Sequence, residues 1–297
     1  MLRVNYGNMK TKPLLTLTVM LGVGLSVCAG SQEPRTFCRY VPERADDFAW
    51  ENDKAAFRMY GPTFLKGKED SGIDCWLKRV DYPVIDTWYG QMKEKTYHRD
   101  WGEGYDPYHV GSSRGCGGLG LWIDGRLITS NVYREWRIIK CEPAESVFVL
   151  SYEWEHDGDV YTEEKQISIK LGDRLFKATS TFRKNGEIAA GLPIAVGLTT
   201  HDGKAAVSEN TEEGWMACWE TIDGDGLGTG VVMEPSRIDA FKAVNSDRKD
   251  ESHALLITKT DRSGQVEYWA GYGWERAGEI KSSNDWNAYL KGFNRGK

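Results

Sequence analysis

Alternation of apolar and polar residues is the main pattern in the body of the chain, and it predicts strands rather than helices. Residues 146–155, SVFVLSYEWE, put Phe148, Leu150, Tyr152 and Trp154 on one face. Residues 174–184, RLFKATSTFRK, alternate in the same way. Asp-Gly and Asn-Gly pairs follow such runs and are typical of hairpin tips. The pattern therefore predicts a largely antiparallel β-structure.

Helical periodicity is confined to two short segments. Residues 81–95 can hold a short helix, and residues 282–293 predict a closing helix with Trp286, Tyr289 and Leu290 facing inward. The chain has no internal repeat and no break in composition. We therefore expect an all-β fold, a large twisted antiparallel β-sandwich with long loops and a short C-terminal helix. It spans residues 53–297 as one domain and follows an irregular segment at 30–52.

The N-terminal residues 1–29 have the layout of a secretory signal peptide. Lys10 and Lys12 precede an apolar run at 14–27, and Ala29 fits the small-residue rule for cleavage. That run is short beside the roughly 20 residues that a bilayer span needs, so no membrane span is expected. The protein is thus predicted to be exported to the periplasm or the extracellular space, with lipid anchoring at Cys28 as the alternative.

Charge and cysteine usage narrow the function further. The formal net charge of −6 argues against nucleic-acid binding. The 12 Trp and 14 Tyr suit stacking on sugar rings, although β-proteins also use aromatic residues for packing. None of the cysteines after residue 29 has metal-ligand spacing, so we expect mostly buried thiols with at most two disulfides. These cysteines are Cys38, Cys75, Cys116, Cys141 and Cys218.

The densest group of reactive side chains is the stretch TYHRDWGEGYDPYHVGSSRGCGG at 96–118. A polar loop of this length in a β-domain is usually functional. We expect His98 and Tyr105 to transfer protons, Tyr108 to contact substrate, and Arg114 to hold an anion. Its glycines allow a close backbone approach to a ligand. The candidate metal ligands are His98, Asp100, Glu103 and His109 from this stretch and His201 from a later one.

Other segments add candidates from elsewhere in the chain. Lys78 in GIDCWLKRV is a possible carboxylate ligand, with an ion pair to Asp74 or another acid on a solvated face as the alternative. His201 in GLTTHDGK follows an apolar strand, so the sheet below it can place its ring accurately. Trp274 in VEYWAGYGW can line a groove. The remaining histidines, His156 and His253, are expected to be peripheral.

Several of these motifs resemble a bacterial family known as domain of unknown function 4861. They are AFRMYGP, which contains Tyr60, GIDCWLKRV, the 96–118 stretch and the closing AGYGW with DWNAYL. The resemblance runs from about Phe57 to Leu290. Such proteins occur in gene clusters for degrading uronate-rich polysaccharides, and one similar protein is an ulvan-oligosaccharide dehydratase. The resemblance also implies a β-sandwich related to sugar-mutarotase-like domains.

That resemblance implies a β-elimination, which makes defined chemical demands. A base takes the proton at C5 of a uronate, a cation holds the carboxylate as charge flows into it, and an acid protonates the leaving oxygen. His98, Tyr105 and His201 are the candidate acids and bases. Lys78, Arg114, Tyr60, Tyr108 and Trp274 are the candidate substrate-binding residues. The expected substrate is a uronate-containing oligosaccharide or polysaccharide, and no cofactor is certain, with a divalent metal left open.

The sequence alone does not choose among four functions. A dehydratase forms a 4,5-unsaturated uronate at the non-reducing end, whereas a polysaccharide lyase expels a glycosyl oxygen. A glycoside hydrolase would use paired carboxylates such as Asp100 and Glu103. A sugar-binding module would need the aromatic residues but not the histidines. The oligomeric state is not specified by any of these patterns.

Overall fold

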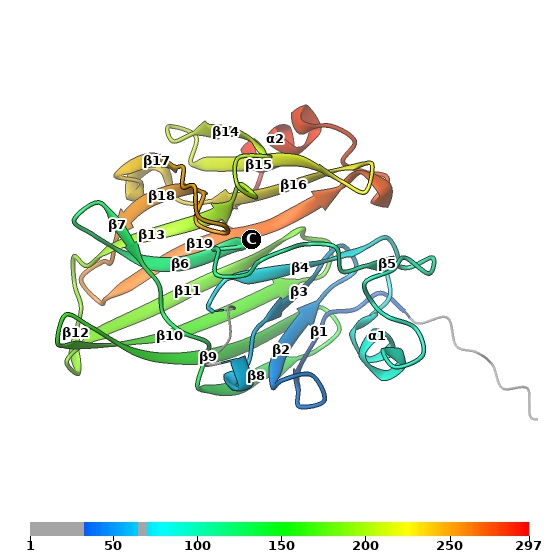
Figure 1. The fold of residues 1–297 in the computed structure, drawn as a ribbon, viewed down its shortest axis with the longest axis horizontal. Helices are drawn as coiled ribbons and strands as arrows, with labels where there is room; N and C mark the ends of the chain where they lie inside the picture. The colour runs from blue at the N-terminus through cyan, green and yellow to red at the C-terminus, as the bar shows by residue number, and fades with distance from the viewer. Residues whose placement is uncertain (1–32, 65–69, 297) are drawn as a thin grey trace, which may run out of the picture. The chain divides into compact units, whose positions relative to one another are not determined.

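The computed structural model describes residues 33–64 and 70–296 and confirms the all-β fold with antiparallel sheets (Figure 1). The proposed signal peptide and Cys28 lie outside the described residues. Two α-helices are present in the described part of the chain, and the strands form three sheets. Among the described residues, no helix is both long and apolar enough to span a membrane.

The first sheet has five strands and includes part of the segment expected to be irregular. Its order is β1 (Phe37–Val41), β2 (Asp47–Glu51), β3 (Ala56–Met59), β4 (Ile73–Lys78) and β5 (Gly104–Tyr105). The expectation for residues 30–52 is wrong where β1 and β2 lie. Residues 47–51 alternate as a strand does, with Phe48 and Trp50 in the main core.

The second sheet has nine strands and forms the other layer of the sandwich. Eight of them follow the order β14 (Ala206–Asn210), β15 (Trp215–Ile222), β16 (Asp225–Val232), β19 (Gln265–Trp274), β11 (Leu175–Lys184), β10 (Asp159–Lys170), β9 (Glu145–His156) and β8 (Glu135–Cys141). The ninth, β12 (Glu187–Ile188), pairs with β11. Phe148 and Phe176 on its inner face contact Trp50 of the first sheet, with ring centroids 5.2 and 5.5 Å away.

The third sheet continues the layer of the first. Its order is β17 (Ala240–Val244), β18 (His253–Lys259), β13 (Pro193–Thr199), β6 (Cys116–Ile123) and β7 (Arg126–Ile128). A parallel bridge between Ile73 and Gly115 links it to β4. The 96–118 stretch therefore runs from the outer surface of the first sheet into the start of β6.

Two helices pack on the outer faces of the sheets. Helix α1 (Ile85–Gln91) places Trp88 against Trp76 of the first sheet. Helix α2 (Ser283–Lys291) is capped by Ser282, one residue before the expected cap, and buries Trp286 and Leu290. Short 3₁₀ turns occur at Pro62–Phe64, Pro235–Arg237 and Glu275–Ala277. Both helices expected from the sequence are thus confirmed.

Candidate functional site

A buried charge cluster lies on the outer face of the first sheet. We call it the Arg58 cluster, and its members are Asp47, Arg58, Asp74 and Asp106. The Arg58 side chain is 3% exposed, hydrogen-bonds to Asp74 and lies 3.0 Å from Asp106 Oδ2. Arg58 and Asp74 are register partners on β3 and β4, so alternation turns both to the same face. One buried guanidinium therefore faces several carboxyl groups.

Burial and crowding perturb these carboxyl groups. Burial, followed by the charge of Asp74, raises the pKa of Asp106 well above its ordinary value, despite Arg58. Burial raises the pKa of Asp47 to about 6, against the opposing charges of Arg58 and Arg44. A cluster with excess carboxylates favours holding a proton near neutral pH. Such perturbed groups concentrate at functional sites, although structural networks also produce them.

His98 lies at the solvent edge of this cluster, where the side chain is 58% exposed. Its Nδ1 atom is 2.9 Å from the backbone carbonyl oxygen of Asp106 and 3.5 Å from the Asp106 carboxylate. Because a carbonyl oxygen only accepts, Nδ1 carries the hydrogen and Nε2 keeps the lone pair in the neutral ring. No hydrogen bond from a described residue occupies Nε2. The described residues therefore leave Nε2 of this exposed ring unengaged.

A pocket of about 240 Å³ lies between α1 and the residues that flank His98. We call it the Trp101 pocket, and it is lined by Thr87, Trp88, Gln91, Lys95, Thr96, Tyr97, Arg99, Trp101, Glu103 and Gly104. Trp101 is 50% exposed. The Arg99 guanidinium lies 4.5 Å from its ring centroid, and the Lys95 ammonium lies 5.9 Å away. Neither cation has an ion pair with a described carboxylate, so both are available to an anion.

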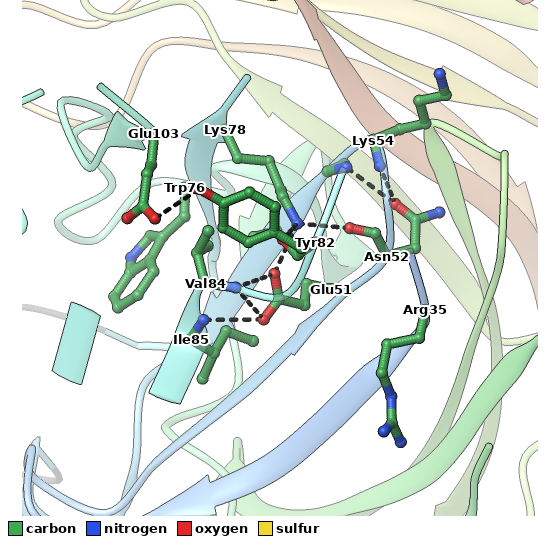
Figure 2. Close-up of polar contacts among 12 residues, drawn as sticks. Arg35, Glu51, Asn52, Lys54, Trp76, Lys78, Tyr82, Val84, Ile85 and Glu103 are labelled. Atoms are coloured by element: carbon green, nitrogen blue, oxygen red, sulfur yellow. Dashed lines mark hydrogen bonds and ion pairs between the residues drawn. The ribbon is translucent and has the colours of Figure 1, made fainter. Parts of the chain in front are cut away.

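Glu103 forms part of the wall of the Trp101 pocket. Its carboxylate accepts hydrogen bonds from the Tyr82 hydroxyl at 2.8 Å and from Trp88 Nε1 at 3.0 Å. Both donors are neutral, so the Glu103 charge is not compensated by them. Its place near Tyr82 is shown in Figure 2. The pocket thus combines two cations, one carboxylate and an exposed aromatic ring.

Tyr105 and Trp274 lie together on the other side of the 96–118 stretch. The Tyr105 hydroxyl donates to Asp223 Oδ2 at 2.9 Å, and its ring centroid is 5.8 Å from that of the fully buried Trp274. Burial, followed by the Asp223 hydrogen bond, raises the pKa of Tyr105. The structure therefore makes Tyr105 a poor base, while its proposed catalytic role and the substrate contact of Trp274 stay predictions.

A second polar group surrounds His201 on this inner side. His201 Nδ1 is 2.7 Å from the Glu220 carboxylate, Nε2 is 2.6 Å from the His109 carbonyl oxygen, and the side chain is 10% exposed. Burial lowers the pKa of His201, but the Glu220 hydrogen bond and charge outweigh burial, so the pKa is raised. Tyr108 packs edge-on at 4.9 Å, with its hydroxyl buried. Both ring nitrogens of His201 are thus already engaged.

Lys78 is enclosed by the first sheet and the start of α1 (Figure 2). Its ammonium donates to Glu51 Oε2 at 2.8 Å and to the carbonyl oxygens of Asn52 at 2.7 Å and Tyr82 at 2.8 Å. The other contacts of Glu51 are the backbone N–H groups at the start of α1. Lys78 therefore pairs with Glu51 rather than with Asp74, and its three donors are used within the protein.

Arg114 is also fully buried. Its guanidinium pairs with Asp70 and donates to Ser71 Oγ at 3.0 Å and the Leu119 carbonyl at 2.8 Å. The neighbouring Gly115 has φ of 53°, and the Ile73 carbonyl occupies the space of its missing side chain. The missing side chain of Gly115 thus makes room for the backbone of β4 rather than for a ligand. The anion-binding role of Arg114 stays a prediction. Most of its hydrogen-bond donors are already bound by protein groups.

The expectation that His253 plays no part in the site stays a prediction, but its side chain is buried rather than at the surface. Its side chain is 4% exposed, and Nε2 accepts a hydrogen bond from the Arg114 backbone N–H at 3.1 Å. Burial, followed by the charge of Arg114, lowers the pKa of His253 to about 4. The ring is therefore neutral and structural at physiological pH.

The predicted residues separate into groups rather than forming one pocket. His98 and Tyr60 lie at the Arg58 cluster, where the Tyr60 ring is 5.3 Å from the Arg58 guanidinium. Tyr108 joins His201, and Tyr105 joins Trp274. Sequence patterns did not predict the roles of Arg58, Lys95, Arg99, Trp101 and Asp106. The neighbouring cation and tryptophan in HRDW were the available signal for the Trp101 pocket.

The candidate metal ligands are held by separate partners. His109 pairs with Asp250 at 2.9 Å, and Asp100 pairs with Arg79 at 3.2 Å and Arg276 at 3.1 Å. Within residues 33–64 and 70–296, no group of three or more His, Cys, Asp or Glu side chains is placed to hold a metal ion. The geometry of the described residues therefore gives no support to a metal centre.

Comparison with known proteins identifies sequence relatives. The model of a family described as domain of unknown function (DUF4861) matches residues 26–296. An uncharacterized protein, P7 of Formosa agariphila, is 35% identical over 269 residues, covering 86% of this chain and 66% of the relative. The chain thus spans about two thirds of that relative's length.

Solved structures are similar at a lower level. A heparan sulfate lyase mutant from Pedobacter heparinus is 11% identical with a TM-score of 0.41, over 80% of this chain and 36% of the other. A putative kojibiose phosphorylase from the human microbiome is 8% identical with a TM-score of 0.43, over 87% and 36%. Similarity at these scores bears on neither activity nor substrate.

Proposed function

The chain belongs to the DUF4861 family, and on that premise we propose that it is an exported carbohydrate-active enzyme that catalyses β-elimination on uronic-acid sugars. One observation carries the proposal. His98 presents to solvent an Nε2 atom that no described residue engages, and its chain neighbours Tyr97 and Arg99 line a pocket whose two cations, Lys95 and Arg99, lack a described carboxylate partner. A base beside an anion-binding pocket is what elimination from a uronate requires.

The chemistry follows from these side chains. His98 Nε2 takes the C5 proton, and the released electron pair forms the C4=C5 double bond. The bond from C4 to its oxygen breaks, and the leaving oxygen keeps that bond's electron pair and takes up a proton from solvent water. Negative charge flows into the sugar carboxylate in the transition state, where Arg99 and Lys95 stabilise it. The fork of Arg99 suits two carboxylate oxygens, whereas Lys95 adds a point charge. The Asp106 carbonyl fixes the tautomer that leaves Nε2 unprotonated.

The Trp101 pocket also supports a sugar rather than another anion. Trp101 offers a half-exposed aromatic face, and Arg99 lies over the same ring. A pyranose that stacks there would bring its carboxylate to both cations. An oligosaccharide dehydratase loses water from the non-reducing end, whereas a lyase loses a glycosyl oxygen. Both reactions use the same base and the same carboxylate-binding cations. We therefore propose β-elimination, and identification of the product distinguishes a dehydratase from a lyase.

The testing experiment incubates the protein with saturated uronate oligosaccharides. Absorbance of an unsaturated uronate should appear, and mass spectrometry should identify the product. Loss of one water at unchanged chain length identifies a dehydratase, and two shorter fragments, one of them unsaturated, identify a lyase. No unsaturated product from pectin, alginate or ulvan oligosaccharides would overturn the proposal.

Two alternative functions give different results in the same assay. A glycoside hydrolase releases sugar without new absorbance. Its candidate Asp100 is a poor general acid, because Gly102, Gly104 and two arginines outweigh burial and lower its pKa. A binding module gives no product, yet calorimetry would detect a uronate oligosaccharide. In that case Trp101→Ala abolishes binding while His98→Gln leaves it unchanged.

A further inference from the structure

Two cysteine thiols meet where the layers of the sandwich come together beside β1. Cys38 lies on β1 of the first sheet, and Cys141 is the last residue of β8 of the nine-stranded sheet. The Cys141 thiol donates to the Cys38 carbonyl oxygen at 3.7 Å, and Cys141 is, after burial, the group that raises the pKa of the Cys38 thiol. Strands from different sheets thus bring these two cysteines into direct contact.

The surroundings of this pair allow a reagent to reach it. Cys38 is 2% exposed, whereas Cys141 is only partly buried. Ser146 hydrogen-bonds to the Cys141 sulfur at 3.8 Å and to Thr36 Oγ1 at 2.8 Å, so polar side chains frame the site. Cys141 is accessible to solvent and lies next to a second cysteine, which is the arrangement of a pair that forms a disulfide.

A second thiol pair provides an internal comparison. After burial, Cys116 on β6 is the main group that raises the pKa of the Cys75 thiol on β4, and both side chains are fully buried. The Cys116 thiol also donates to the Gly271 carbonyl at 3.2 Å. Cys218, the fifth described cysteine, is 1% exposed. Two pairs of neighbouring cysteines therefore occur among the described residues, but only the Cys38–Cys141 pair includes a partly exposed thiol.

We propose that Cys38 and Cys141 form a disulfide that joins β1 to β8 when the folded protein meets a disulfide oxidant. With oxidised glutathione, the Cys141 thiolate attacks the glutathione disulfide and releases one glutathione thiolate. The Cys38 thiol then loses its proton, attacks the Cys141 sulfur and releases the second glutathione. Two protein thiols are oxidised to one disulfide, and one glutathione disulfide is reduced to two thiols.

The proposed bond should stabilise the fold, because it closes a long stretch of chain. A disulfide lowers the entropy of the unfolded state more as the enclosed loop grows, and this one encloses residues 38–141. For a chain of this size we expect the midpoint of thermal unfolding to rise by roughly 5–10 °C. Burial, followed by Cys141, raises the pKa of the Cys38 thiol to about 12, so bond formation should be faster at pH 9 than at pH 7.

The test compares reduced protein with protein treated with oxidised glutathione. Each sample is alkylated in denaturant, digested with trypsin and analysed by mass spectrometry without reduction. The expected product links the peptide at 36–39 to the peptide at 141–165, and treated protein has two fewer alkylated cysteines. Thermal unfolding of both samples provides the second measurement, and Cys141→Ser should lose both the linked peptide and the shift.

The outcomes separate cleanly. A linked peptide that joins Cys38 to Cys141, with Cys75 and Cys116 still alkylated, supports the proposal. Full alkylation of all cysteines after treatment overturns it, as does a link between Cys75 and Cys116 alone. Since the experiment uses wild-type protein first, a folding defect in Cys141→Ser does not affect the result. It also requires no sugar substrate, so it is independent of the proposed activity.

Discussion

The two sides of the 96–118 stretch differ in how their polar groups are satisfied. On the inner side, Tyr105 donates to Asp223 and His201 is held between Glu220 and a backbone carbonyl. On the outer side, Arg99 and Lys95 have no carboxylate partner among the described residues and lie on an exposed Trp101. The difference teaches that reactive residue types alone do not mark a site. Ionic groups left unpaired beside a pocket are the stronger indication of a ligand.

The largest expected effect on stability comes from the buried arginine of the outer side. Arg58→Met leaves Asp74 and Asp106 buried without their cation, which should cost about 3–5 kcal/mol of unfolding free energy. Urea unfolding followed by fluorescence measures it. The matched variant Arg99→Met, in an exposed arginine, should stay within about 0.5 kcal/mol of wild type. Equal losses in the two variants would mean that Arg99 is structural too.

A somewhat smaller effect is expected on catalysis when the guanidinium of Arg99, which has no carboxylate partner among the described residues, is removed. Arg99→Gln should lower kcat/KM on a uronate oligosaccharide by about 100-fold, because the developing carboxylate charge loses its clamp. Lys93→Gln removes a cation that does not line the pocket and should leave kcat/KM nearly unchanged. If Arg99→Gln and Lys93→Gln lower kcat/KM equally, the total positive charge of the loop accounts for the loss, and the specific role of Arg99 is contradicted.

The smallest effect concerns the inner histidine and the pH dependence of stability. The pKa of His201 is raised in the folded protein, so its contribution to stability is fully present below the unfolded value near 6.5. That contribution is lost as pH rises through the folded pKa, because the proton that strengthens the pairing with Glu220 is then released. The unfolding free energies of wild type and His201→Gln, measured by urea unfolding, should therefore converge as pH rises. A difference that grows above pH 7 would contradict the assigned pairing with Glu220.

Much of the fold could be predicted from the sequence because alternation and turn residues report it directly. Phe148, Leu150 and Tyr152 face the core as their spacing indicates, and the helix at Trp286 closes the chain. The first two strands were missed because each has only five residues and lies in a polar segment. Strands this short carry too few alternating positions for periodicity to separate them from loops.

The site was less predictable, because its members are brought together by strands distant in sequence. Lys78 and Arg114 looked available as anion ligands, yet Glu51 and Asp70 neutralise both in the interior. Sequence spacing carries no record of such pairings between elements. Trp101 with Arg99 was visible as a local pair, but only the fold shows that α1 and Glu103 complete a pocket around them.

The central claim is that His98 on the outer side acts as the base while His201 on the inner side supports the structure. The most direct test measures kcat and thermal unfolding for His98→Gln and His201→Gln, with His156→Gln as the control. We expect His98→Gln to keep its unfolding midpoint and to lose about 100-fold or more in kcat, because a positioned base contributes at least that much. His201→Gln should lose stability and keep kcat within about tenfold. Full activity in His98→Gln, with activity lost in a stably folded His201→Gln, would contradict the account.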